Sequence, residues 1–240
     1  MDAASYVTLT RQSGLQAEMR TIANNIANAS TTGFRREGVI FSEFISDLGG
    51  DDPSLSMAAA QVRDTRLDQA PLTQTGATYD FAIEGDGFFL IEGATGPLLT
   101  RAGAFTPNAA GELATLDGYR LLDAGGAPVF VPPDAAAVSL AADGTLSADG
   151  QPIGEIGLWQ PVDPTDLQHR DGVRFEAPGG VQPMFDGAVI LQGFLENSNV
   201  DPIGEFARMI EIQRAYEQGQ QFLDREDQRI RGVIEALLKR

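Results

Sequence analysis

The residue types that most often carry catalysis or bind metals are sparse in this chain. It has one histidine, His169, and no cysteine. His169 lies in the polar stretch 166–170, where a lone histidine is typically a solvated loop residue. A two-histidine metal site is therefore excluded, a catalytic triad is not indicated, and without thiols neither disulfides nor thiolate-bound zinc can form.

Carboxylates are the second possible source of chemistry. The chain contains several Asp-Gly pairs, but none has the D-x-[DN]-x-[DN]-G spacing of a calcium loop, and each stands where a tight turn is needed. Glu84 and Asp86 flank the tip of an expected hairpin, which rarely frames the cleft that an acid–base pair requires. There is also no phosphate loop or dinucleotide fingerprint. We therefore expect no enzyme, no cofactor and no metal site, and a hydrolase using these two acids is the weakest alternative.

The charge of the chain is concentrated in its middle. The formal net charge is −17 over 240 residues. Residues 1–36 hold four arginines and two acids, and residues 201–240 hold seven bases and eight acids, whereas residues 37–200 hold six arginines and twenty-four acids. No basic stripe is present, so nucleic acid is not an expected partner. No apolar run is long enough for a membrane span, and the first residues do not resemble a secretory signal, so we expect no direct membrane insertion.

With no sign of catalytic chemistry, the surfaces of the helices and strands are the next place to look for a function. A helix is predicted over residues 3–29. Its apolar residues are spaced four and three apart, which is a heptad seam on one side of a helix. Asn24 and Asn28 lie on the opposite side and are poor helix formers, which favours a contact outside the seam. Gly33 can end the segment with a positive φ, and Phe34 can fold back as an apolar anchor. The seam consists of Leu15, Met19, Ile22, Ile26 and Ala29.

A second, longer helix is predicted from Pro202 to the C-terminus, with Asp201 as its N-cap. Its seam has two poor positions, because Gly219 leaves a gap and Glu226 places a charge there. Because each helix needs a partner, the simplest prediction is that the two helices pair with each other. The seam consists of Met209, Ile212, Tyr216, Gly219, Leu223, Glu226, Ile230, Val233 and Leu237.

The residues between the helices show the period of strands. Short apolar runs alternate with Gly, Asp and Pro from about 78 to 195, which predicts an all-β sandwich or open barrel, including a hairpin of 81–84 with 88–91. Residues 37–77 read as an extended, partly β connector. The predicted fold class is α+β: a discontinuous helical domain of 1–36 and 196–240, in which the terminal helices pair in a coiled-coil-like manner, with the connector and an outer β domain of 78–195 inserted.

Three stretches of the chain resemble a known family. Residues 24–35, beginning Asn-Asn-Ile-Ala-Asn and ending Gly-Phe-Arg, are similar to the N-terminal signature of the rod and hook axial proteins of the bacterial flagellum. Residues 80–89 resemble the start of the middle domain of that family, and residues 196–217 resemble its C-terminal helix. The resemblance spans most of the chain, although residues 37–70 and 135–185 carry little of it. Within the family, the start and length of the chain are most like the proximal rod members.

The resemblance implies a structural subunit of the proximal rod that self-assembles through its terminal helices and transmits torque. The implied partners are copies of itself, other proximal and distal rod proteins, and the flagellar type III export apparatus. That apparatus would deliver the chain to the periplasmic rod without a cleaved signal. The alternatives are a distal rod or hook subunit and, more remotely, a secreted ligand-binding β module with oligomerising helices. The expected assembly residues are Leu15, Met19, Ile22, Asn24, Asn25, Ile26, Asn28, Gly33, Phe34, Asn197, Asn199, Met209, Ile212, Tyr216, Leu223 and Ile230.

Overall fold

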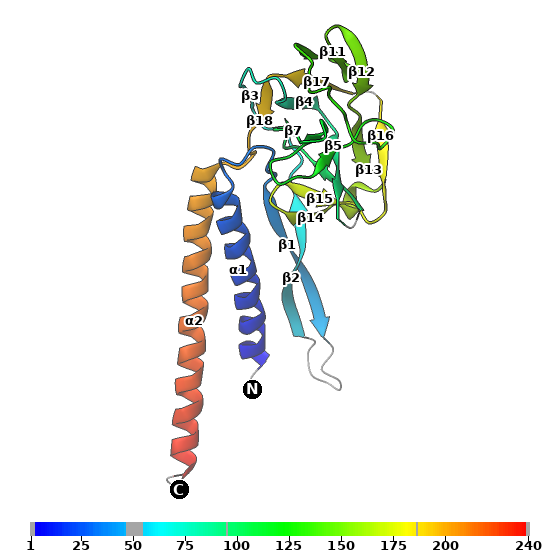
Figure 1. Cartoon of the computed structure of the whole chain (residues 1–240). Coiled ribbons are helices and arrows are strands. Elements are labelled where there is room, and N and C mark those ends of the chain that lie inside the picture. The colour runs from blue at the N-terminus through cyan, green and yellow to red at the C-terminus, as the bar shows by residue number, and fades with distance from the viewer. Residues whose placement is uncertain (1–2, 47–54, 95, 186, 239–240) are drawn as a thin grey trace. The chain divides into compact units, whose positions relative to one another are not determined.

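The computed structural model describes residues 3–46, 55–94, 96–185 and 187–238 (Figure 1). The chain divides into two compact units. The helical unit comprises residues 1–27, 37–66 and 200–240, and the β unit comprises residues 28–36 and 67–199. The predicted α+β architecture is confirmed, because the two terminal helices contact each other and a β-rich insert separates them in sequence.

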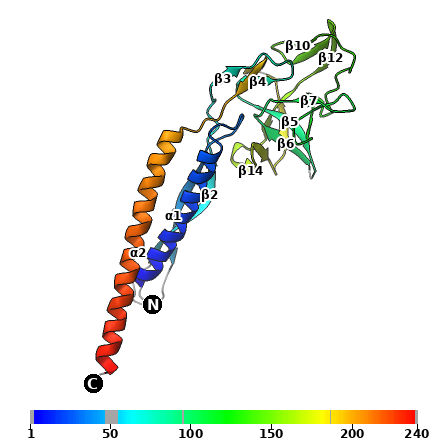
Figure 2. The same ribbon diagram turned by 60° about the vertical axis from the view of Figure 1, so that its left-hand side comes forward.

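The helical unit is built on the helices α1 (Ala3–Ala27) and α2 (Pro202–Leu238). They run antiparallel, and Figures 1 and 2 show that α2 continues well past the N-terminal end of α1. Asp201 caps α2 as predicted: its carboxylate accepts a hydrogen bond from the Ile203 amide at 3.1 Å. Among the described residues, no helix has both the length and the apolarity that crossing a membrane requires.

A long antiparallel hairpin completes the helical unit. Strands β1 (Glu37–Ser46) and β2 (Leu55–Thr65) pair along their length, with one register shift after Ile40, and α1 contacts both strands. Residues 37–77 are predicted to form a partly β connector. In the structure the hairpin groups with the two helices, and only the residues from 67 onward belong to the β unit. The predicted division into a helical domain of 1–36 and 196–240, a connector and an outer β domain of 78–195 stays a prediction as a division of function.

The β unit is assembled from short strands in several sheets. The largest sheet has the order β14-β15-β6-β5-β9-β8-β7, and β13 joins it through β5 and carries β16. The smaller sheets are β10-β11-β12, β17-β4 and β18-β3. One short 3₁₀ helix, η1 (Pro164–Asp166), lies before β14. The strands are β3 (Leu72–Gln74), β4 (Phe81–Gly85), β5 (Phe88–Gly93), β6 (Gly96–Thr100), β7 (Thr106–Pro107), β8 (Leu113–Ala114), β9 (Arg120–Leu121), β10 (Val138–Leu140), β11 (Thr145–Ala148), β12 (Gln151–Glu155), β13 (Leu158–Pro161), β14 (Gln168–Asp171), β15 (Arg174–Glu176), β16 (Val181–Met184), β17 (Ala188–Gln192) and β18 (Phe194–Glu196).

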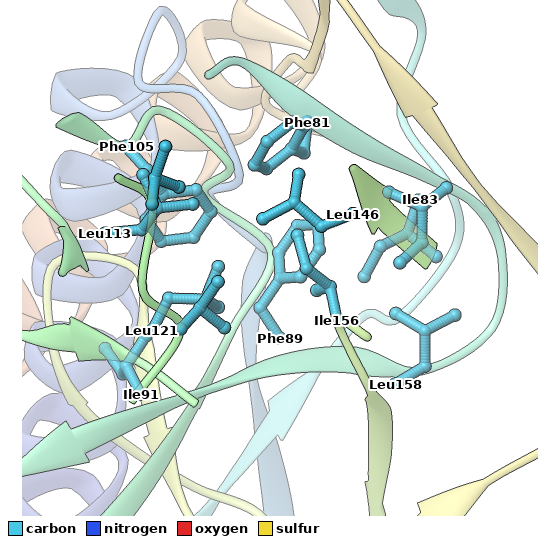
Figure 3. Close-up of a cluster of buried hydrophobic side chains, with 13 residues drawn as sticks. Phe81, Ile83, Phe89, Ile91, Phe105, Leu113, Leu121, Leu146, Ile156 and Leu158 are labelled. Atoms are coloured by element: carbon cyan, nitrogen blue, oxygen red, sulfur yellow. The ribbon is translucent and has the colours of Figure 1, made fainter. Parts of the chain in front are cut away.

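The main core of the β unit is a cluster of buried aliphatic and aromatic side chains (Figure 3). Phe81 from β4 and Phe89 from β5 meet there with Phe105, and the Phe89 and Phe105 rings contact edge to face at 5.6 Å. A second cluster on the other side of β5 contains Phe88, and Trp159 packs against it. Apolar side chains on both faces of β5 explain its unbroken apolar sequence.

Two local predictions are wrong. Residues 81–84 and 88–91 do not form a hairpin with each other, because β4 pairs with β17 whereas β5 pairs with β6, β9 and β13. Residues 81–83 and 88–91 are buried, and a two-stranded hairpin cannot cover both faces of each strand. His169 is not a solvated loop residue: it lies in β14, is half-buried, and contacts the rings of Phe34 and Phe175 edge-on.

Candidate assembly interface

The predicted seams of the two helices meet in the helical unit. Leu15, Ile22 and Ile212 are buried at their centre. Full burial of one such side chain contributes roughly 1.5–3 kcal/mol, so these three residues dominate the helix contact. Other predicted residues lie half-buried around them, namely Met19, Ile26, Met209 and Tyr216.

The coverage of the seam ends part-way along α2. Leu223 is half-buried, whereas Ile230, one heptad further on, is 39% exposed. At the predicted gap at Gly219, a side chain that the sequence did not indicate lies against the glycine. Gln12 of α1 lies so close that a Cβ on residue 219 would be 2.1 Å from its Nε2, which donates a hydrogen bond to the Tyr216 carbonyl at 2.8 Å. The glycine therefore serves the close approach of a polar side chain.

Asn25 forms a polar contact inside the helical unit. It is fully buried, its Oδ1 accepts from the Glu37 amide at 3.0 Å, and its Nδ2 donates to the Glu37 carbonyl at 2.8 Å. The same Nδ2 donates to Glu205 Oε2 at 3.1 Å, so this one amide ties α1 to both α2 and β1. Its neighbour Asn24 reaches Glu37 Oε2 at 3.5 Å. Asn24 and Asn25 thus bond within the chain, and contacts with other subunits stay a prediction for them.

The segment after α1 belongs to the β unit and carries three more predicted residues. Asn28 Oδ1 accepts from the Thr31 hydroxyl at 3.1 Å, which closes a turn after the helix. Gly33 has φ +73°, and its amide donates to the Glu196 carbonyl at 2.8 Å. Phe34 is completely buried. The predicted glycine turn and apolar anchor are therefore both present in the structure.

We expect Gly33→Ala to destabilise the β unit by at least about 2 kcal/mol. The φ value favours glycine, and a Cβ at this position would lie 2.3 Å from the Ala102 backbone nitrogen, which cannot move without shifting the strand connection. Gly76→Ala is the matched control, because Gly76 has φ +72° but a Cβ added there would meet no atom within 4 Å. Urea denaturation should show a much larger loss of unfolding free energy for Gly33→Ala than for Gly76→Ala. Equal losses would show that the nearby Ala102 backbone is not what requires glycine at position 33.

Beside this turn lies a buried ion cluster that joins the first and last segments of the β unit. Arg35 Nη2 contacts Glu196 Oε1 at 2.7 Å, Arg101 Nη1 contacts Glu196 Oε2 at 3.3 Å, and all three side chains are at most 4% exposed. Glu196 also accepts from the Ala70 amide at 2.9 Å. Burial lowers the pKa of Arg101 to about 10, against the opposing effect of the Glu196 carboxylate. One carboxylate therefore holds two buried guanidinium groups.

Asn197 and Asn199 extend this junction. Asn199 Oδ1 accepts from the Arg36 amide at 2.6 Å, and its Nδ2 donates to the Asp68 carbonyl at 3.0 Å. Asn197 Nδ2 donates to the Thr73 hydroxyl at 3.0 Å. These two asparagines bind the segments that enter and leave the β unit to each other, and contacts with other subunits again stay a prediction.

Sequence reasoning missed the charged and amide partners in these contacts. The missed residues are Gln12, Arg35, Glu37, Arg101, Glu196 and Glu205, which bond partners between 12 and 204 residues away. Glu37 and Arg101 had no local signal, because a charged residue in a strand pattern normally indicates a solvated face. Arg35 and Glu196 lie inside the stretches that resemble the family but have no periodicity that predicts burial.

Comparison with known proteins agrees with this architecture at both ends and in the middle of the chain. Residues 6–35 match the model for flagella basal body rod proteins, residues 82–148 match the flagellar hook protein FlgE/F/G D1 domain, and residues 191–235 match the flagellar basal body rod FlgEFG protein C-terminal model. Among curated proteins, the flagellar basal-body rod protein FlgF of Caulobacter vibrioides is 39% identical over 246 residues, covering 100% of this chain and 99% of the relative. The chain belongs to the flagellar basal-body rod protein family.

Other members of the rod protein family are similar over most of their length. FlgF of Mesorhizobium japonicum is 39% identical over 90% of both chains, and the rod protein FlgG of Bacillus subtilis is 30% identical over 95% of this chain and 97% of the relative. The chain is thus a FlgF-like rod protein. The rod protein family is structural and non-enzymatic.

Proposed function

We propose that this protein is a structural subunit of the proximal part of the flagellar rod, which assembles through α1 and α2 with copies of itself and with other rod subunits and transmits torque. The observation that carries the proposal is the incomplete coverage of α2. Its seam is buried at Ile212 but exposed at Ile230, Val233 and Leu237, so the helix pair presents apolar surface that a partner must cover.

The distribution of charge supports assembly through the helices. The net charge of −17 comes from residues 37–200, and the two terminal segments are each close to neutral. Copies can therefore approach through α1 and α2 with little repulsion, while an acidic β unit facing outward stays solvated. The resemblance of the chain to proximal rod members supports the proximal position. FlgF proteins, which the resemblance indicates as these members, match at 36–39% identity, whereas FlgG proteins match at 28–30%. A distal rod or hook subunit is the alternative.

The export route belongs to the same proposal. We infer that the flagellar type III apparatus delivers the chain to the periplasmic rod, as the family resemblance implies. Deletion of an essential export component should then leave the protein in the cytoplasm, and fractionation with immunoblotting checks this. Delivery to the periplasm in such a strain would contradict the route.

Site-specific crosslinking in isolated basal bodies tests the proposed position. The chain has no native cysteine, so one cysteine introduced at Ile203, which is 81% exposed on α2, gives a unique attachment site. Mass spectrometry of the crosslinked products should identify other rod subunits at one level of the rod. Ile203→Ser, treated in the same way, is the control for non-specific products. Crosslinks to hook subunits alone, or absence of the protein from basal bodies, would contradict the proposal.

A further inference from the structure

A groove lies between α1 and α2 at the level of Gly219. Its volume is about 300 Å³, and its walls are mostly apolar, with Arg11 at its edge. Along α1 it extends from Val7 to Leu15, which is about 12 Å at 1.5 Å per residue. Phe222, 40% exposed, forms part of the α2 wall. A groove of this length matches about two turns of one further helix.

Gln12, which lines this groove, is only partly satisfied. The residue is 6% exposed, and its Nε2 donates to the Tyr216 carbonyl. Its Oε1 is buried and has no hydrogen-bond partner within the described part of the chain. A buried acceptor without a donor costs about 1–3 kcal/mol, so the Gln12 amide keeps unused hydrogen-bonding capacity in the groove wall.

The same molecule carries a convex apolar surface that nothing in the described residues covers. We call residues 229–238 of α2 the tail; the figures show this end of α2 beyond the start of α1. Its apolar stripe, from residue 230 to residue 238, also extends about 12 Å. The tail further carries Arg231, whose Nε pairs with Asp227 Oδ2 at 2.8 Å, and Glu235, whose charge is opposite to that of Arg11 at the groove. The exposed stripe residues are Ile230 (39%), Val233 (52%), Ile234 (50%), Leu237 (67%) and Leu238 (81%).

We propose that the tail of one copy of this chain docks in the groove of a second copy. Groove and stripe agree in length and polarity, and the stripe continues the seam that already packs against α1 in its own chain. The contact is heterologous, since different surfaces of the two copies meet, and such contacts build open helical assemblies when rotation does not close them. The inference rests on the proposed function and specifies which surfaces meet.

Sedimentation of the full chain over about 1 µM to about 1 mM tests this contact, because that range covers weak single interfaces. The wild type should associate increasingly with concentration. Phe222→Glu in the groove and Leu237→Glu in the tail should each weaken association about 10- to 100-fold, as expected for replacing one covered large apolar side chain with a charge. Phe206→Glu is the matched control, because Phe206 is 55% exposed on the same helix outside both surfaces, and it should associate like the wild type.

Mixing the two variants decides whether the contact is heterologous. The Phe222→Glu chain keeps an intact tail, and the Leu237→Glu chain keeps an intact groove. Only one tail–groove contact can then form, so a 1:1 mixture should form dimers and no larger assemblies. Circular dichroism must show unchanged helix content in each variant. A wild type that stays monomeric to about 1 mM, variants that associate like the wild type, or a mixture that does not dimerise would each overturn the proposal. Such results would leave the rod assignment, tested by crosslinking in basal bodies, untouched.

Discussion

Replacing Ile212 with aspartate is expected to separate the two helices and abolish assembly of this protein into the rod. Ile212 is 4% exposed and packs against Leu15 and Ile22 at the centre of the seam. The substitution removes roughly 1.5–3 kcal/mol of apolar burial. It also places in that seam a carboxylate whose burial is unfavourable without a partner. A total of about 4 kcal/mol is a large fraction of the roughly 5–15 kcal/mol that stabilises a typical folded domain.

The effect of Ile212→Asp should be confined to the helical unit. Trp159 is the only tryptophan and lies in the β unit, so its fluorescence should keep the wild-type emission while circular dichroism shows reduced helix content. Ile210→Asp, two residues away and 50% exposed, should retain the helix content. Cells that carry Ile212→Asp as their only copy should be non-motile. Normal motility, or a shifted Trp159 emission, would contradict the assignment of the seam.

Replacing Glu196 with alanine is expected to destabilise the β unit by about 3–5 kcal/mol, the range measured when one partner of a buried ion pair is removed. The substitution would leave Arg35 and Arg101 buried without their shared ion-pair partner and the Ala70 amide without its acceptor. Urea denaturation followed by Trp159 fluorescence measures this destabilisation.

Glu92→Ala provides the comparison for that experiment. Glu92 pairs with Arg120 at 2.5 Å in the same unit, but the two side chains are 45% and 39% exposed. An exposed pair of this kind contributes at most about 1 kcal/mol. The urea concentration at the midpoint of unfolding should therefore be well below that of Glu92→Ala when Glu196 is replaced with alanine. Similar midpoints for the two variants would show that the buried cluster does not stabilise the β unit.

The elements that depend on local pattern could be predicted from the sequence. The spacing of Leu15, Ile22 and Ile212 predicted which sides of α1 and α2 meet, because helix periodicity needs only neighbouring residues. The N-cap at Asp201 and the glycine turn at Gly33 were predictable for the same reason. The strands were predictable as strands, but their partners were not, as β4 and β5 demonstrate.

Contacts between distant polar residues could not be predicted in this way. Nothing near Gln12 indicates that it fills the gap at Gly219, and nothing near Arg101 indicates that Glu196 neutralises it. The direction of these side chains depends on the packing of whole elements, and a charged residue is a surface residue by default. The sequence could therefore locate the interface elements but not the amides and ions that join them.

The ties at Glu196 have a mechanical consequence. Its carbonyl holds the Gly33 amide and its carboxylate holds Arg35, so the segment that enters the β unit is fastened directly to the segment that leaves it. Tension applied between the ends of α1 and α2 would pass through this fastening and would not pull the intervening strands apart. Changes in the length or shape of the β-unit sheets would then leave the path of force between α1 and α2 unaltered.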